Sequence, residues 1–173
     1  MKLCGLDFET ANSCNGSICS VGVAVVENGE VLERKEYLIK PHKSLDWMSK
    51  FCRDIHGITY EDLRESPEFS EVWQSVKQLL ISADCVVVHD APFDLRHLHK
   101  VLEFYHLQSV SFDYVCSLQL CRHHFPELPL GSVFQCNLGH TFPCCVLPGL
   151  QVPSMARKRD VCSFFIVAKG KEK

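Results

Sequence analysis

The stretch that decides the fold is ICSVGVAVVENGEVLERKEYLI, which occupies residues 18–39. It contains two β-rich runs, residues 18–27 and 30–39, joined by the dipeptide Asn28-Gly29. Asn-Gly between two such runs is the strongest short-range signal for a β-hairpin. A further apolar run at residues 2–8 precedes the hairpin across a polar loop. The chain is therefore expected to begin as a three-stranded antiparallel sheet, which ends at Pro41.

Helical and strand patterns alternate after the hairpin. Apolar residues at helical spacing predict one helix over residues 67–81 and another through residues 95–105. A short β-branched run of the fully buried kind predicts a strand at residues 85–88 between them. A further strand at residues 112–115 and a helix at residues 116–124 complete the pattern. Three strands followed by alternating helices and strands indicate an α/β fold with a mixed sheet flanked by helices.

The composition is that of a single soluble domain. The chain has 173 residues, of which 46% are hydrophobic and 23% charged, a balance typical of globular proteins. It has no apolar run of the roughly 18 residues that a membrane span needs, and no segment resembling a secretory signal, so a cytoplasmic protein is expected. The net charge of −3 gives no sign of a basic nucleic-acid-binding surface. It does not exclude a nuclease, because metal-binding carboxylates offset basic side chains.

The cysteine pattern does not indicate disulfide bonds. The eleven cysteines are odd in number and irregularly spaced, and reduced, mostly buried thiols are expected. An alternative is a structural zinc site formed by Cys136, His140, Cys144 and Cys145, since sulfur and imidazole are the usual zinc ligands. The chain contains no CxxC pair, which argues against that interpretation.

The first group of candidate functional residues is Leu6-Asp7-Phe8-Glu9-Thr10, at the end of the first strand. Residues i and i+2 of a strand point to the same face, so Asp7 and Glu9 present two carboxylates side by side. Such a pair repels itself unless a cation is bound, and hard oxygen ligands suit Mg²⁺ or Mn²⁺. The alternative is a solvated strand end with two incidental acids.

The second group is His89-Asp90-Ala91-Pro92-Phe93-Asp94, which follows the buried strand and begins a helix. Asp94 falls in the first helical turn, where the helix dipole favours a carboxylate. Asp94 is therefore a third candidate metal ligand, and simple helix capping is the alternative interpretation.

Four segments of the chain resemble motifs of the DEDD superfamily of 3′→5′ exonucleases, in its DEDDh (DnaQ-like) branch, and they occur in the same order along the chain as in that family. LDFETAN at residues 6–12 matches the first motif of the family, and VHDAPFDL at residues 88–95 matches the second. Residues 16–22 also fit, as do IHGIT at residues 55–59 and the Glu61-Asp62 pair that follows. The resemblance covers about residues 3–142. Within the family, the chain resembles the epsilon proofreading subunit of bacterial DNA polymerase III. It implies a ribonuclease H-like fold.

The resemblance implies a reaction and a set of partners. Asp7, Glu9 and Asp94 would hold two Mg²⁺ or Mn²⁺ ions at a nucleic-acid 3′ end, and the product would be a nucleoside 5′-monophosphate. DNA is expected in preference to RNA, and a DNA polymerase or another replication or repair protein is the expected protein partner.

The resemblance also nominates substrate-binding residues. Phe8 and Thr10 would contact the end of the strand, Ile58 would pack on the terminal bases, and Phe93 would support the pocket. For Ile58 and Phe93, a plain role in the core is the alternative.

The chain departs from the family in two places. Asp90 stands where the family usually has Asn, which adds a possible extra acid near the metals. The third motif, His-x₄-Asp, supplies the general base and the fourth metal ligand in the family, and it is absent after Phe142. We therefore divide the chain into an exonuclease domain, residues 1–142, and an anomalous tail, residues 143–173, for which a shift of reading frame is one hypothesis. Catalysis is expected to be weakened, and the alternative function is a catalytically impaired nucleic-acid-binding or polymerase-accessory module.

Overall fold

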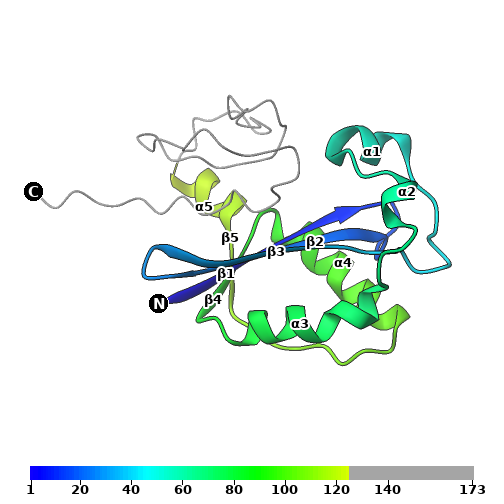
Figure 1. Ribbon diagram of the computed structural model, residues 1–173. Coiled ribbons are helices and arrows are strands. Elements are labelled where there is room, and N and C mark those ends of the chain that lie inside the picture. The colour runs from blue at the N-terminus through cyan, green and yellow to red at the C-terminus, as the bar shows by residue number, and fades with distance from the viewer. Residues whose placement is uncertain (125–173) are drawn as a thin grey trace, which may run out of the picture.

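The computed structural model describes residues 1–124, which form a five-stranded mixed sheet with helices packed against it (Figure 1). The strand order is β3-β2-β1-β4-β5, with β1 antiparallel to β2 and parallel to β4. This arrangement confirms the expected mixed-sheet α/β fold. The elements, in chain order, are β1 (Lys2–Thr10), β2 (Ile18–Glu27), β3 (Glu30–Leu38), α1 (Lys50–His56), α2 (Tyr60–Leu63), α3 (Phe69–Ile81), β4 (Cys85–Val88), α4 (Ala91–Phe104), β5 (Tyr114–Cys116) and α5 (Ser117–His124).

The β2–β3 hairpin turns at Asn28-Gly29, as the sequence predicts. Both residues have left-handed backbone conformations, with φ of 51° and 86°, and Gly and Asn are the residues that adopt them at least cost. A register shift between Val25 and Val26 then sets which residues of β3 lie opposite β2.

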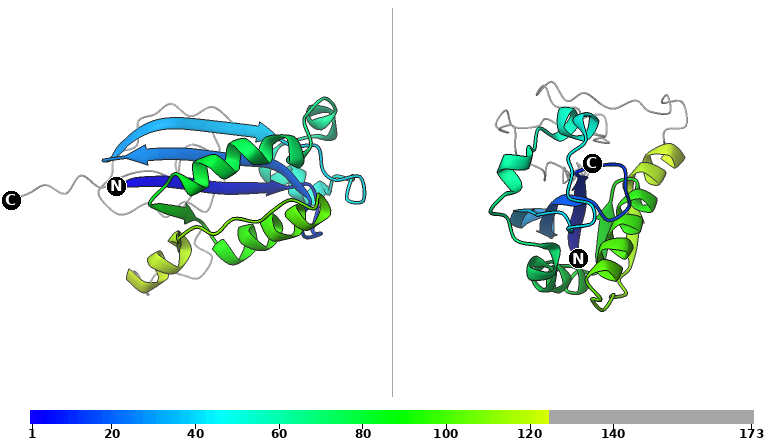
Figure 2. Two further views of the ribbon diagram at one scale, coloured as in Figure 1. Left: turned by 90° about the horizontal axis from the view of Figure 1, so that it is seen from below. Right: turned by 90° about the vertical axis from the view of Figure 1, so that its right-hand side faces the viewer.

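The hydrophobic core lies between one face of the sheet and the helices α3 and α4, which both views place on that face (Figures 1 and 2). Alternate residues of β1 supply the inner face, and Phe8 lies 6.4 Å from the Phe69 ring, centroid to centroid. Phe69 in turn stacks on Trp73 at 5.7 Å. The side chains of β1 that alternate with this set, Asp7 and Glu9 among them, therefore point to the opposite face.

Three details differ from the sequence-based expectations. The last strand is Tyr114–Cys116, two residues later than predicted at its start. The helix predicted from residue 67 begins at Phe69, because the Glu68 and Glu71 side chains form a capping box at its N-terminus. The short helices α1 and α2 were not predicted, since α1 buries no residue and α2 has four residues.

The six cysteines whose state the structure gives are free thiols, in agreement with the expected reduced state. Three of them are buried: Cys4, Cys19 and Cys116. None of the helices found in residues 1–124 is long and apolar enough to cross a bilayer. The proposed zinc ligands, the position of the missing third motif and the tail at residues 143–173 lie outside the described residues.

Candidate active site

The first two acids occupy the end of the central strand, as predicted. The parallel pairing of β1 with β4 ends at Leu6 and Val88, so the last residues of β1 extend beyond β4. Across β2, Asp7 lies opposite Gly22 and Glu9 opposite Ser20. Asp7 and Glu9 are both partly exposed, whereas Phe8 between them is buried in the core. Alternation along β1 therefore directs the two carboxylates away from the core and to the same face.

Asp94 reaches the same edge of the sheet from the first turn of α4. Because Val88 lies beside Leu6, the segment after β4 runs beside the acidic end of β1. The Phe8 backbone N–H donates a hydrogen bond of 3.3 Å to Asp94 Oδ1. Asp94 is only 2% exposed, so a carboxyl group distant in sequence is buried directly beside the Asp7-Phe8-Glu9 segment.

Burial and neighbouring acids raise the pKa values of all three acids. Burial first, and then the charge of Glu36, raises the pKa of Asp7 to about 7. Burial raises the pKa of Glu9 to about 8, with contributions from Asp7 and Glu36. For Asp94, burial and then Asp7 raise the pKa to about 9, although the Phe8 amide acts in the opposite direction. These acids therefore share one electrostatic environment that opposes three negative charges.

The donor set fits a hard divalent cation. It consists of carboxylate oxygens, which Mg²⁺ and Mn²⁺ prefer, and a cation would relieve the mutual repulsion of Asp7, Glu9 and Asp94. The three side chains do not converge on one point, and residues 1–124 contain no group of three or more His, Cys, Asp or Glu side chains arranged to hold a metal ion. The fit to a cation therefore rests on donor chemistry and shared electrostatics.

Glu36 of β3 is an acid near the site that sequence reasoning missed. It lies opposite Gly22, which lies opposite Asp7, so the three residues form a row across three strands. The Ser20 hydroxyl donates a hydrogen bond of 3.1 Å to Glu36 Oε1. Only the register of the hairpin, with its shift at Val25, brings Glu36 into this row, and the sequence gives no direct signal of that shift.

Asp90, the suspected extra acid, is exposed at the N-cap of α4. Its charge is one of the causes that raise the pKa of Asp94, so its field reaches the site. Its backbone is left-handed, with φ of 54°, a conformation that Asn and Asp tolerate better than other non-glycine residues. This requirement explains why both Asn and Asp suit the position.

The nominated substrate-binding residues take different positions. Phe93 is 36% exposed on the first turn of α4, and its ring centroid lies 4.5 Å from that of His97. Phe93 is therefore a surface aromatic beside Asp94. The Phe8 side chain belongs to the core, and Phe8 meets the site through its backbone amide.

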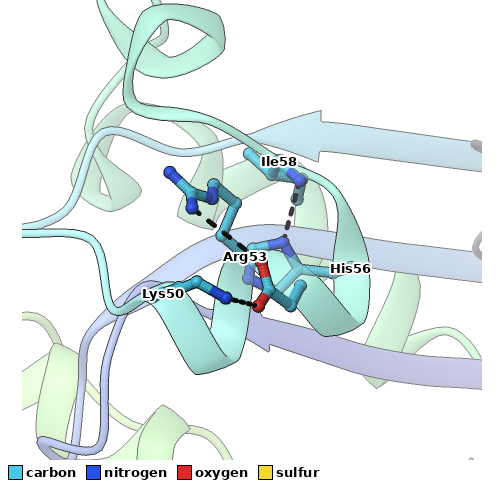
Figure 3. A network of polar contacts seen from close by, with 5 residues as sticks. Lys50, Arg53, His56 and Ile58 are labelled. Carbon is cyan, nitrogen blue, oxygen red and sulfur yellow. Dashed lines mark hydrogen bonds and ion pairs between the residues drawn. The ribbon is translucent and has the colours of Figure 1, made fainter.

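His56 joins Thr10 to Ile58 at the rim of the site, and Figure 3 shows its contact with Ile58. Its Nδ1 accepts a 3.0 Å hydrogen bond from the Ile58 N–H, which leaves Nε2 to donate to the Thr10 carbonyl at 3.2 Å. Burial lowers the pKa of His56, in keeping with this neutral tautomer. Ile58 packs partly buried against a small second cluster formed by Ala11, Cys19 and Leu63.

Two buried polar residues with supporting roles were also missed. Asn12, within the first motif, donates from Nδ2 to the carbonyls of Leu45 and Trp47 at 3.0 and 2.8 Å. His97 accepts a hydrogen bond of 3.1 Å from the Gly16 N–H at Nδ1. Both residues fix the loops around the acids, and the buried apolar stripe of α4 that includes His97 was the only sequence signal for it.

Comparison with known sequences points to one family. The sequence model described as Exonuclease (RNase_T) matches residues 4–137. The DNA polymerase III subunit epsilon of Haemophilus influenzae is 31% identical over 133 residues, which are 70% of this chain and 50% of that protein. The DNA polymerase III PolC-type of Oceanobacillus iheyensis is 28% identical over 124 residues, which are 70% of this chain and 8% of that protein. The chain thus spans about half of the first relative and a small part of the second.

Comparison with solved structures supports the same fold. Exonuclease X in complex with 5′ overhanging duplex DNA gives a TM-score of 0.57 at 22% identity, over 73% of this chain and 66% of that chain. The nuclease domain of 3′hExo, a DEDDh family member bound to rAMP, gives a TM-score of 0.59 at 16% identity, over 74% of this chain and 72% of that chain. At these identities the likeness establishes the ribonuclease H-like fold.

Proposed function

Because the chain belongs to the exonuclease family that the RNase_T model describes, we propose that it hydrolyses phosphodiester bonds at nucleic-acid 3′ ends. The products are nucleoside 5′-monophosphates, and the substrate is DNA in preference to RNA. The observation that carries the proposal is the burial of Asp94 against the Phe8 amide, which brings the second motif to the two acids of the first. The relatives are components of DNA polymerase III, which supports a polymerase as the protein partner.

Asp7, Glu9 and Asp94 are the residues that would hold Mg²⁺ or Mn²⁺. When bound, such ions supply the positive charge that activates water and stabilises the developing charge on the phosphate. The strand β1 fixes two of the carboxylates on one face, and α4 fixes the third through the Phe8 amide. The raised pKa values of the three acids mean that a cation competes with protons for them, so binding is expected to strengthen with rising pH.

The remaining residues of the site position the nucleotide. Thr10 and Ile58 are held in a fixed relation by His56, and Phe93 presents a partly exposed ring beside Asp94 in the first turn of α4. A terminal base could pack against Ile58 and Phe93, while the strand end lies near Thr10. Asp90 adds negative charge at the start of α4.

End-labelled oligonucleotides test the proposal. Single-stranded DNA and RNA, labelled at either the 5′ or the 3′ end, are incubated with the protein in Mg²⁺, in Mn²⁺ and in chelator. Progressive shortening of the 5′-labelled strand, with release of the mononucleotide from the 3′-labelled strand, is expected only with metal. Internal cleavage, or degradation from the 5′ end, would refute the polarity, and full activity in chelator would refute the role of metal.

A second candidate function is a nucleic-acid-binding or polymerase-accessory module with impaired catalysis. The observation that favours it is the absence of His-x₄-Asp after Phe142, because a general base contributes about 10²–10⁴-fold to rate. Such a module would retain the labelled strand without shortening it. Replacing the residues after Phe142 with a helix that bears His-x₄-Asp at the family spacing is expected to raise the rate, and equal rates would show that another residue acts as the base.

A further inference from the structure

Helix α1 is an unusual surface element because it buries none of its residues. It nevertheless exposes Phe51 by 74% and Ile55 by 49%, one helical turn apart, and Trp47 just ahead of the helix is 50% exposed. Apart from Met1, Phe51 is the most exposed large apolar side chain found in residues 1–124. Apolar side chains that gather on a surface mark an interaction site more often than scattered ones do.

Polar contacts hold α1 against the segment that directly follows Glu9. The Ser49 N–H donates to the Ala11 carbonyl at 2.7 Å, and His56 Nε2 donates to the Thr10 carbonyl at 3.2 Å. The Asn12 amide donates to the Trp47 carbonyl at 2.8 Å. Figures 1 and 2 both show α1 beyond the carboxyl end of β1, where the acids lie. The exposed rings therefore lie on or beside an element that is hydrogen-bonded to the rim of the candidate active site.

We propose that Phe51 and Trp47 form a stacking surface for nucleotides upstream of the 3′-terminal one. This inference rests on the proposed exonuclease function and extends the site by an interaction surface on α1. Single-stranded nucleic acid is the occupant that the position favours, because hydrogen bonds fasten the helix that carries Phe51 to the residues that directly follow Asp7 and Glu9. A flat aromatic ring accepts any base, so the surface would bind without regard to sequence.

The charges around the rings indicate how this surface binds. Lys50 pairs with Asp54 at 2.5 Å, and Arg53 lies 3.9 Å from the same carboxylate (Figure 3). The two basic side chains of α1 thus share one carboxylate, which leaves a net charge of only one on the helix. The rings rather than net charge should therefore supply most of the affinity. The contribution of Phe51 is accordingly expected to persist at salt concentrations that weaken phosphate contacts.

Binding measured by fluorescence anisotropy tests the inference on the full chain. The probes are a 5′-labelled single-stranded DNA oligonucleotide and a labelled dinucleotide, with Ca²⁺ in place of Mg²⁺ to limit cleavage. Phe51→Ala is expected to weaken binding of the oligonucleotide about tenfold, in line with the loss of one stacked base, and to affect the dinucleotide much less. Trp47→Ala should act in the same direction. Phe51→Trp should preserve the affinity, whereas Phe51→Leu, which is apolar without a ring, should lose most of it.

Leu32→Ala is the matched control, since Leu32 is 58% exposed on the hairpin strand β3. Unfolding by urea checks that each variant remains folded, which is expected because α1 contributes nothing to the core. If the oligonucleotide binds the unaltered chain and Phe51→Ala equally well, the inference fails and the proposed function stands. If the unaltered chain binds no oligonucleotide, the proposed function and the inference fail together.

Discussion

Protonation of His97 is predicted to destabilise the fold at mildly acidic pH. The residue is 2% exposed, and its Nδ1 accepts the Gly16 N–H, so a proton there would be buried and would remove the acceptor. Burial, and then the charge of Arg96, lowers the pKa of His97 from 6.5 to about 4. In the unfolded chain the ring takes up a proton below about 6.5, whereas in the folded chain it resists until about 4. Stability from this residue is therefore fully present above pH 6.5 and is lost as the pH falls through that window.

The size of the effect follows from the same values. Each factor of ten in proton affinity is worth about 1.4 kcal/mol, so the fall from 6.5 to about 4 amounts to about 3 kcal/mol. The free energy of unfolding is measured by urea titration from about pH 8 to about pH 4 for the unaltered chain and for His97→Leu. The variant should be less stable at neutral pH, because the Gly16 amide loses its acceptor, and the gap should close by about 3 kcal/mol toward pH 4.

The comparison between the two proteins isolates His97 from the other titrating groups. The pKa values of Asp7, Glu9 and Asp94 are raised in the folded chain, so their ionisation lowers the free energy of unfolding as the pH rises. This contribution is the same in both proteins. His56, whose pKa is lowered by burial, is likewise common to both. A gap that stays constant across the pH range would refute the reasoning, because it would mean that folding does not change the proton affinity of His97.

Three further predictions concern the site and its surroundings. Asp7→Asn and Asp94→Asn should each reduce nuclease activity in the labelled-strand assay, by a factor that corresponds to a loss of about 3 kcal/mol or more of transition-state stabilisation. A variant that is folded and fully active would contradict the assignment. Gly16→Ala should lower stability by about 2 kcal/mol or more, because the backbone has φ of +88° and the new Cβ would lie 2.8 Å from a ring carbon of α4. Gly57→Ala is the control for backbone strain alone, because Gly57 has φ of +76° and open space around it. Equal melting temperatures for Gly16→Ala and Gly57→Ala would therefore contradict the steric argument. Asp90→Asn should keep the fold, since Asn suits its left-handed backbone, and should weaken Mn²⁺ binding in calorimetric titration, so unchanged affinity would show that the acid does not serve the metals.

The sheet was largely predictable because its signals are local. Asn28-Gly29 specifies the hairpin, and the apolar run of β4 specifies a buried strand. The start of β5 was misplaced because Phe112 is apolar and packs against the core without pairing with β4. The helix α1 was missed because helical periodicity reports burial, and α1 buries nothing.

The acids of the site were predictable for a different reason. Asp7 and Glu9 follow from alternation along one strand, and Asp94 follows from its place in the first turn of a helix. The proximity of Asp94 to Asp7 was implied by the family resemblance, and the Phe8 hydrogen bond now places Asp94 beside that segment. Glu36 was not predictable, because a shift of one residue in the pairing of β2 and β3 would turn its side chain to the other face.

The central place of β1 has a consequence for how the molecule moves. Leu3–Leu6 pairs with β2 on one edge and with β4 on the other, so these amides can exchange with solvent only when much of the sheet opens. Amides in α1, which buries no side chain, lack that protection and should exchange by local opening. Asp7 and Glu9 directly follow this slowly exchanging segment on the same strand, whereas the exposed rings lie on or beside α1, whose amides should exchange faster. A nucleic-acid strand that enters the site would meet a surface that can adjust to it, next to two carboxylates that are anchored to the central strand.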